Sequence, residues 1–281
     1  MARSGSPSRP AAARRTRAGI VARRRFGQHF LVDAGVVHAI VEAIGPRPDD
    51  TLVEIGPGPG ALTDALLARI GHLDAIEIDR DLAAALLARH GAERLSLHQA
   101  DVLAFDWRGF AGARRLRIVG NLPYNISTPL LLDLLAHADL VVDQHFMLQK
   151  EVVARIAADP GGADYGRLGI LLQARYDCNW LFDVPPESFD PPPRVDSAVL
   201  RMTPRPSRVR SMAALSQLLA IAFGQRRKML RGHLLPWLRE RGIEDAALEP
   251  TRRAEEIDQE TWYRVADRLA DRLAESGREP G

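Results

Sequence analysis

The chain has 281 residues, of which 46% are hydrophobic and 26% are charged, and its formal net charge at pH 7 is +2. These values are typical of a folded chain with an ample core, so they exclude a chain that is disordered throughout. The single cysteine, Cys178, excludes an internal disulfide and a cysteine-based zinc cluster. It favours a reducing compartment, and we expect a cytoplasmic protein.

Two further classes are excluded because their patterns are missing. No apolar run reaches the length of a membrane span, since the run at 130–142 is interrupted by Asp133, His137 and Asp139. We therefore expect no membrane contact. The eight histidines show no HExxH or other ligand spacing, so we expect no metal site.

The N-terminal segment is strongly basic. Its first 25 residues contain eight arginines and no acidic residue. Residues 1–22 lack apolar periodicity, so we expect a flexible basic tail there, with the folded chain beginning at residue 23. Basic tails commonly contact nucleic acid, and the run Arg23, Arg24, Arg25 is a candidate RNA contact. An organelle transit peptide has a similar composition and stays an alternative.

The next segment starts an alternation of strands and helices. Apolar residues at helical spacing predict a helix over 34–44, which Gly45 and Pro46 end. Strands are then expected at 51–55, 72–78, 95–99, 116–120 and 140–148, with helices at 61–69, 81–90 and 128–137. Strands that alternate with helices of this length indicate parallel βαβ units in a sheet covered on both faces. The predicted fold is a doubly wound α/β sheet.

The second half of the chain is expected to change character. We predict a helix at 150–158, a loop at 159–167, and two more strands at 168–176 and 195–202. The proline-rich segment 184–194 must be a stiff loop. Pro204 and Pro206 mark a boundary between a domain at 23–204 and an all-helical domain at 205–272, followed by a polar tail at 273–281.

A glycine-rich loop follows the first expected strand of the sheet. Gly56, Gly58 and Gly60 occupy the turn where, in open α/β sheets, the backbone approaches a ligand closely. Their spacing is GxGxG rather than the GxGxxG of dinucleotide sites, and no GxxxxGK(S/T) phosphate loop is present. The glycines alone leave three interpretations open, which are a nucleoside-type cofactor, a tight turn, and NAD.

A carboxylate stands at the end of the second expected strand, and another follows the third. Glu77 can accept hydrogen bonds from both hydroxyls of a ribose, and Asp101 can accept one from the exocyclic amine of an adenine. Either residue alone could be a solvated loop carboxylate. Together with the glycines they favour a cofactor that contains adenosine. S-adenosylmethionine (SAM) fits better than NAD, because it has no pyrophosphate to place on a helix N-terminus.

The tetrapeptide Asn121-Leu122-Pro123-Tyr124 ends the strand expected at 116–120. The oxygen of Asn121 and the carbonyl of Leu122 or Pro123 can accept hydrogen bonds from an aromatic amine, which favours a more nucleophilic nitrogen. Proline presets the direction of such a carbonyl, and Tyr124 offers a face on which a base can stack. Phe189, in the proline-rich loop, is a second candidate for stacking. These residues therefore predict methyl transfer to an amino group of a nucleobase, with an Asn-x-Pro turn as the structural alternative.

Four segments of the chain resemble the rRNA adenine N6-dimethyltransferases: 23–31 (RRRFGQHFL), 54–60 (EIGPGPG), 121–127 (NLPYNIS) and 189–197 (FDPPPRVDS). Three more are similar to the small-subunit branch of that family, called KsgA or RsmA: 149–152 (QKEV), 165–168 (YGRL) and 223–228 (FGQRRK). The resemblance covers residues 22 to 270, and several separate motifs in one order make it specific.

The resemblance implies a Rossmann-like class I SAM-dependent methyltransferase with a small helical C-terminal domain. It implies that two methyl groups are transferred from SAM to N6 of each of two adjacent adenosines, in a hairpin loop near the 3′ end of small-subunit rRNA. The partner is then the rRNA in a precursor of the small subunit, and we expect a monomer. By the same resemblance, the cofactor contacts fall on His29, Leu31, Gly56, Gly58, Glu77, Asp101 and Asn121. The adenine pocket falls on Asn121, Leu122, Pro123, Tyr124 and Phe189.

His29 departs from this family pattern, since asparagine is more usual at its position, although an imidazole can still donate one hydrogen bond. A second basic cluster in the expected helical domain is a candidate RNA contact, with a solvated helix face as the alternative. It consists of Arg226, Arg227, Lys228 and Arg231.

Three other functions compete with this hypothesis. The antibiotic-resistance branch of the family dimethylates a large-subunit adenosine, but it usually has isoleucine where Leu122 stands. A relative that binds nucleic acid without catalysis would not need the glycine loop, Glu77, Asp101 and Asn121 together. An NAD-dependent oxidoreductase would leave the tetrapeptide at 121–124 unexplained. The sequence therefore favours the small-subunit enzyme.

Overall fold

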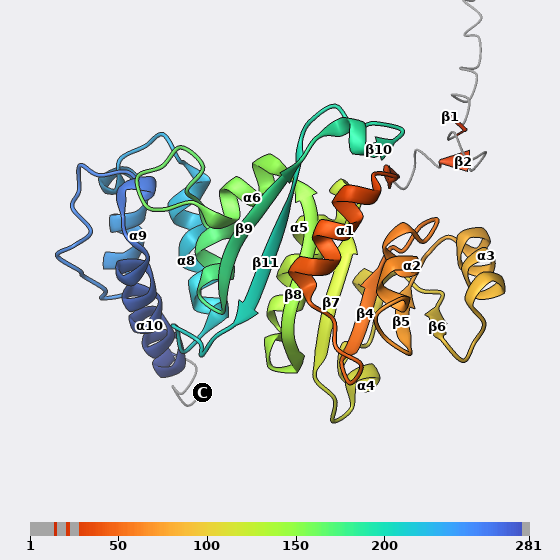
Figure 1. The fold of residues 1–281 in the computed structure, drawn as a ribbon. Coiled ribbons are helices and arrows are strands. Elements are labelled where there is room, and N and C mark those ends of the chain that lie inside the picture. The colour runs from red at the N-terminus through yellow and green to blue at the C-terminus, as the bar shows by residue number, and fades with distance from the viewer. Residues whose placement is uncertain (1–13, 16–20, 23–27, 277–281) are drawn as a thin grey trace, which may run out of the picture.

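The computed structural model describes residues 14–15, 21–22 and 28–276. A seven-stranded sheet forms its centre, with the order β6-β5-β4-β7-β8-β11-β9 (Figure 1). These strands are β4 (Thr51–Ile55), β5 (Leu73–Ile76), β6 (Leu95–His98), β7 (Leu116–Asn121), β8 (Val141–Gln149), β9 (Tyr176–Val184) and β11 (Ser197–Pro204). β4 to β8 run parallel, whereas β11 is antiparallel to both of its neighbours. The predicted α/β fold is confirmed.

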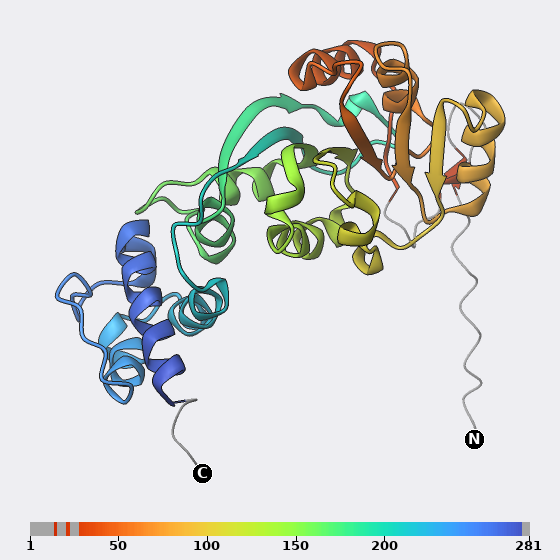
Figure 2. The ribbon, with the colours of Figure 1, turned by 90° about the horizontal axis from the view of Figure 1, so that it is seen from below.

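Helices cover both faces of the sheet, as Figure 2 shows from below. One face packs against α1 (Ala34–Ile44), α2 (Ala61–Leu67) and α3 (Arg80–His90). The other packs against α4 (Trp107–Ala111), α5 (Tyr124–Leu135) and α6 (Lys150–Ala157). The parallel strands are apolar on both faces for this reason, which is why they appear in the sequence as nearly continuous hydrophobic runs. Among the described helices, none has the length and apolar character needed to cross a membrane.

Most of the predicted elements of the sheet are found. The helix at 34–44 and the strand at 51–55 are confirmed to the residue. The helix predicted at 128–137 is α5, which begins four residues earlier, at Tyr124. Consequently the tyrosine of the tetrapeptide is the first residue of a helix, and its side chain is oriented by that helix.

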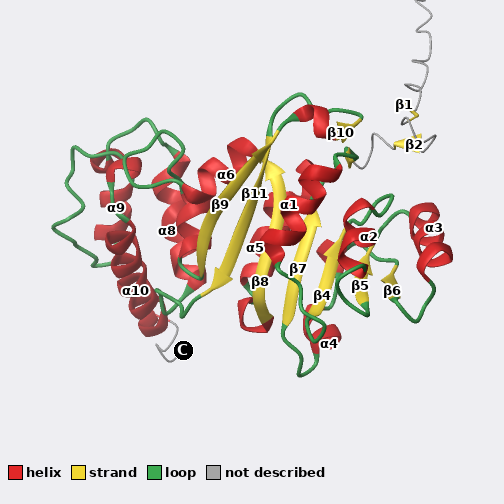
Figure 3. Cartoon of the chain, viewed as in Figure 1, coloured by secondary structure: helices red, strands yellow, loops and turns green. Residues whose placement is uncertain are grey.

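The strand predicted at 168–176 is wrong. This segment forms a helix, α7 (Arg167–Gln173), and the strand that follows, β9, begins at Tyr176. Figure 3 shows β9 beside β11, its partner in the sheet. In α7, Ile170, Leu171 and Leu172 are all fully or almost fully buried. The middle of this short helix, residues 168–172, has no polar residue, so its apolar run has the same pattern as that of a buried strand.

The chain after residue 204 is helical, as predicted. It contains α8 (Met212–Gly224), α9 (Leu234–Arg239) and α10 (Gln259–Ser276), which lie beyond β9 in Figure 1. Their apolar core also includes Tyr165, Ile170 and Leu171 from before the predicted boundary. The division of the chain at residue 204 stays a prediction.

The predicted N-terminal tail lies almost entirely outside the described residues. Within it the structure describes only the antiparallel pair β1 (Arg14–Arg15) and β2 (Val21–Ala22). A second short pair, β3 (Phe30–Leu31) with β10 (Phe189–Asp190), joins the start of the folded chain to the proline-rich loop. This pairing brings two motifs together that are more than 150 residues apart in the sequence.

A buried arginine fastens α1 to the sheet. The Arg117 side chain, on β7, donates hydrogen bonds to Asp143 at 2.9 and 2.7 Å and to Asp50 at 2.6 Å. It also donates to the carbonyls of Ile44 and Gly45, at 2.5 and 3.2 Å. The end of α1 thus gains partners for carbonyl groups that have none within the helix. The two carboxylates raise the pKa of Arg117, which stays charged.

We predict that Arg117→Leu lowers the free energy of unfolding by about 3 kcal/mol or more, because buried Asp143 loses both hydrogen bonds from its cation and keeps only the Arg201 cation, at 3.9 Å. Urea denaturation measures this change. The matched control is Arg69→Leu, which removes an exposed pair with Glu42 and should cost less than about 1 kcal/mol. Equal losses in the two variants would contradict the structural role of Arg117.

Candidate active site

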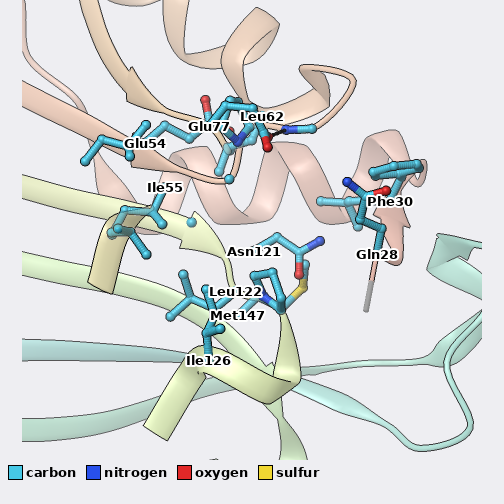
Figure 4. Close-up of a pocket in the computed structure, with 18 of the residues that line it drawn as sticks. Gln28, Phe30, Glu54, Ile55, Leu62, Glu77, Asn121, Leu122, Ile126 and Met147 are labelled. Carbon is cyan, nitrogen blue, oxygen red and sulfur yellow. Dashed lines mark hydrogen bonds between the residues drawn. The ribbon is translucent and has the colours of Figure 1, made fainter. Parts of the chain in front are cut away.

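A cavity opens at the carboxyl ends of β4, β5 and β7 (Figure 4). All residues that we predicted as cofactor contacts line it: His29, Leu31, Gly56, Gly58, Glu77, Asp101 and Asn121. Leu122, Pro123 and Tyr124 line it as well. The topology explains this convergence, because parallel strands end at one edge of the sheet and the loops after them meet there.

The glycine loop is a tight turn made possible by backbone angles that favour glycine. Gly56, Gly58 and Gly60 have φ values of 65°, 57° and 96°. A Cβ on Gly58 would lie 3.2 Å from the ring of Phe30, and one on Gly60 would lie 2.5 Å from Leu86. The bare backbone of the loop therefore forms one wall of the cavity, where a ligand can approach it closely.

Two carboxylates stand at the neighbouring strand ends. Glu77 is buried and accepts hydrogen bonds from the N–H groups of Gly58, at 3.1 Å, and Asp79, at 2.8 Å. Burial raises its pKa, and these donors counteract the rise. Asp101 is exposed and accepts from the N–H of Leu103 at 3.0 Å. Because a carboxylate oxygen can accept two hydrogen bonds, both groups keep acceptor capacity for a ligand.

Asn121 lies at the centre of the cavity, between Glu77 and Met147 (Figure 4). Its Nδ2 donates a hydrogen bond to the carbonyl of His29 at 2.9 Å. The amide is therefore oriented: the nitrogen is engaged, and Oδ1 is the atom left to accept from a ligand. The N–H of the next residue, Leu122, donates to the carbonyl of Met147 at 3.2 Å and fixes the tetrapeptide to β8.

Tyr124 is half-buried at the start of α5. Its hydroxyl lies 2.9 Å from Oγ of Ser197, on β11. The imidazole of His29 is stacked over its ring, with ring centroids 5.8 Å apart and an angle of 26° between the planes. Burial raises the pKa of Tyr124. The hydroxyl is consequently neutral at pH 7, and the ring is held from two sides.

The two walls of the cavity meet where β7 passes β4. A Cβ on Gly120 would lie 2.5 Å from the carbonyl oxygen of Ile55, which is closer than any real side chain could be. Gly120 thus allows the end of β7 to approach the beginning of the glycine loop. Asn121 and Gly56 become neighbours for this reason.

Two buried polar residues of the cavity were missed in the sequence analysis. Glu54, on β4, accepts a hydrogen bond from the Thr63 hydroxyl at 2.6 Å, and burial raises its pKa to about 8. His145, on β8, has no hydrogen-bond partner for either ring nitrogen among the described residues, and burial lowers its pKa to about 4. A glutamate inside the apolar run at 51–55 was a signal for the first. Nothing in the sequence distinguished the second from an ordinary core residue.

The structure does not bring Phe189 to the cavity wall. Its side chain is 4% exposed and packs in the apolar core with Leu31, Met147 and Val199. The reason is its strand pairing, since Phe189 faces Leu31 in the short pair of β10 with β3. The stacking role that we expected for Phe189 stays a prediction.

Of the two predicted basic clusters, only the second lies within the described residues. Arg23, Arg24 and Arg25 lie outside the described residues. Arg226 donates a hydrogen bond to Glu255 at 2.7 Å and another to the carbonyl of Ala163, so it holds two loops together. Arg227, Lys228 and Arg231 are exposed, and within the described part of the chain the structure shows no ion pair for them.

The exposed cations directly follow α8. This helix comes after β11, which is antiparallel to β8, and it packs on α7 and α10. The carbonyl of Tyr165, just before α7, accepts a hydrogen bond from Arg226, just after α8.

The chain matches the family model described as ribosomal RNA adenine dimethylase over residues 20–271. It is 52% identical over 255 residues to the ribosomal RNA small subunit methyltransferase A of Dechloromonas aromatica, covering 90% of this chain and 99% of that protein. The protein of the same name from Methylibium petroleiphilum is 57% identical over 257 residues, covering 90% of this chain and 96% of the relative.

Two solved structures share the fold. A dimethyladenosine transferase from Plasmodium falciparum aligns with a TM-score of 0.73 at 23% identity, covering 87% of this chain and 98% of that one. The 23S rRNA methyltransferase ErmE aligns with a TM-score of 0.64 at 23% identity, covering 86% of this chain and 99% of that one. The name of the second structure states an RNA substrate, 23S rRNA, whereas the name of the first states none.

The raised pKa of Glu54 generates a prediction on stability. The folded chain keeps the proton of Glu54 up to about pH 8, whereas an unfolded glutamate loses it near its ordinary value of 4.5. The free energy of unfolding should accordingly fall as the pH rises from about 4.5 to 8, relative to Glu54→Gln, by up to a few kcal/mol. Urea denaturation at several pH values measures the difference. For the control Glu93→Gln, at an exposed residue, the free energy of unfolding should change with pH as it does in the unchanged protein. The same pH dependence for Glu54→Gln would contradict the prediction.

Proposed function

The chain belongs to the ribosomal RNA adenine dimethylase family, and from this premise we propose that it dimethylates N6 of two adjacent adenosines in a 3′-terminal hairpin loop of small-subunit rRNA. The observation that carries the proposal is the constellation around Asn121. The amide of Asn121, whose orientation is fixed, the proline turn after it and the ring of Tyr124 line one cavity. A glycine loop and two carboxylates line the same cavity.

The choice of the small subunit rests on sequence rather than on fold. The relatives that are 52% to 57% identical are named for the small subunit. The large-subunit methyltransferase shares the fold at 23% identity, which carries no statement on substrate. The intact glycine loop, Glu77 and Asn121 also argue against a relative without catalysis. An NAD-dependent function is not favoured, since it would give Asn121 and Tyr124 no task.

The residues of the cavity fit SAM as the methyl donor. Acceptor-only groups at two successive strand ends, Glu77 and Asp101, suit ribose hydroxyls and an adenine amine. The bare backbone at Gly56 and Gly58 leaves room for the methionine portion, beside His29 and Leu31. When bound, SAM supplies an electrophilic methyl group on a sulfonium. The protein's task is to hold it in line with the accepting nitrogen.

The amine that accepts the methyl group needs to be oriented more than it needs a general base to remove its proton. An adenine amine is a weak nucleophile, because its lone pair is delocalised into the ring. Oδ1 of Asn121, and the carbonyl of Leu122 or Pro123, would accept its two N–H groups and favour a tetrahedral nitrogen. Tyr124 would hold the ring by stacking. For each methyl group that arrives, the nitrogen gives up one proton, which passes to water.

We further propose that a monomer acts on the rRNA within a precursor of the small subunit. The exposed cations Arg227, Lys228 and Arg231 support RNA contact, because they have no ion pair among the described residues and can neutralise phosphates. Arg226 would act indirectly, by fixing this segment to the loop before α7. Arg23 to Arg25 are proposed as further contacts from the sequence alone.

We predict that Asn121→Ala lowers methylation by on the order of a hundredfold or more, since it removes the group that orients the amine. The measurement supplies labelled SAM with undermethylated small subunits, large subunits and naked RNA, and then maps N6,N6-dimethyladenosine. Asn179→Ala, on the exposed edge strand β9, is the matched control and should behave as the unchanged protein. Label confined to the large subunit would refute the proposed function.

A second prediction concerns the basic segment. The double variant Arg227→Gln/Lys228→Gln should raise the KM for small subunits several-fold and reduce the slope of log affinity against log salt by about two. The control Arg47→Gln/Arg69→Gln removes the same charge at the edge of the sheet opposite the cavity. An equal change in KM and in salt dependence for both double variants would show a general effect of charge rather than a contact of this segment with RNA.

A further inference from the structure

The glycine loop is in contact with α3, a helix that does not itself reach the cavity. Residues 56–59 of the loop line the cavity, whereas no residue of α3 does. Leu86 and Arg89 lie one turn apart on α3, and both reach the end of the loop. A Cβ on Gly60 would lie 2.5 Å from Leu86 and 3.2 Å from a guanidinium nitrogen of Arg89. The close packing of α3 on the loop therefore favours glycine at this position.

One peptide group of the loop, between Pro59 and Gly60, is held at both ends. The N–H of Gly60 donates a hydrogen bond to the carbonyl of Pro57 at 3.0 Å. The carbonyl of Pro59 accepts one from the Arg89 guanidinium at 3.1 Å. A proline ring fixes φ but not ψ, and glycine adopts φ of either sign, so neither residue sets the plane of this peptide by itself. The two hydrogen bonds set it instead.

Arg89 is held in turn by Asp64, in the first turn of α2. The nitrogen that donates to Pro59 lies 3.1 Å from each oxygen of the Asp64 carboxylate. Oδ1 of Asp64 also lies 2.8 Å from Nε2 of His90. Both side chains of the Arg89–Asp64 pair are half-exposed, and such a pair adds little to the stability of a fold. Its effect is on geometry, because it keeps the guanidinium beside the loop.

We propose that Arg89, held by Asp64, is a positioning residue for the cofactor, which fixes the plane of the Pro59–Gly60 peptide and thereby the shape of the wall against which SAM lies. The inference rests on the proposed function, because it takes SAM as the ligand of the cavity. SAM has a net positive charge, so a nearby arginine disfavours its binding by Coulomb repulsion. A gain in SAM affinity from Arg89 is therefore due to the shape of the loop and not to charge.

Calorimetric titration with SAM tests the proposal in three variants. Arg89→Met keeps an apolar stem without the donors, and it should weaken SAM binding about threefold to tenfold, the range of one net hydrogen bond. Arg89→Lys keeps a donor of similar reach and should fall between Arg89→Met and the unchanged protein. The matched control is Arg80→Met, which removes the same charge from the exposed start of α3 and should bind SAM as the unchanged protein does.

A second ligand separates the effect of geometry from that of charge. S-adenosylhomocysteine, which remains after the methyl group has left SAM, lacks the positive sulfonium. A displaced loop weakens the binding of both ligands equally, whereas the loss of a cation would strengthen SAM binding relative to S-adenosylhomocysteine. With undermethylated small subunits, Arg89→Met should raise the KM for SAM and leave kcat within about twofold of the unchanged protein.

Equal SAM affinities of Arg89→Met and the unchanged protein would overturn the inference. So would an equal loss of affinity in Arg80→Met, or a lower kcat with an unchanged KM for SAM. These outcomes leave the proposed function in place, because it requires only that the unchanged protein bind SAM and methylate small subunits. An unchanged protein that binds no SAM would refute the proposed function and this inference with it.

Discussion

The candidate site depends on the close approach of two neighbouring strands. Gly120 on β7 lies so near the carbonyl of Ile55 on β4 that no side chain fits between them. The glycine loop begins immediately after Ile55, and the tetrapeptide begins immediately after Gly120. The pairing of β4 with β7 therefore determines how far the glycine loop lies from the tetrapeptide. Methyl transfer requires that this distance be fixed to a fraction of an ångström.

The part of the cavity around Asn121 is assembled from segments that are far apart in the sequence. Asn121 donates to the backbone at His29, His29 is held by Pro191, and Tyr124 is held by Ser197. The short pair of β3 with β10 brings the segment that contains His29 next to the proline-rich loop that contains Pro191. The proline-rich loop thus acts on the site through the position of its backbone. Its aromatic residue, Phe189, contributes to the core that supports β3.

The sequence predicted those parts of the site that follow strand ends, because in an open α/β sheet their position is dictated by topology. The loop at 56–60, Glu77 and Asn121 are of this kind. It did not predict that the rings of His29 and Tyr124 stack on each other, because no local sequence pattern indicates a contact between two distant loops. Glu54 and His145 were missed for a related reason. A polar residue within a buried strand has the same spacing as its apolar neighbours, and only its surroundings show that it faces a cavity.

The helix that was predicted as a strand, α7, explains how the two parts of the molecule act together. Leu172 belongs to the core beneath the sheet, whereas Ile170 and Leu171 belong to the core of the C-terminal helices. A helix shared by two cores must be apolar on all sides, which removed the periodicity that would have identified it. Just before α7, the carbonyls of Ala163 and Tyr165 hold Arg226, which anchors the exposed basic segment. The same helix therefore connects the core beneath the sheet to the core of the C-terminal helices, directly after the loop that holds Arg226.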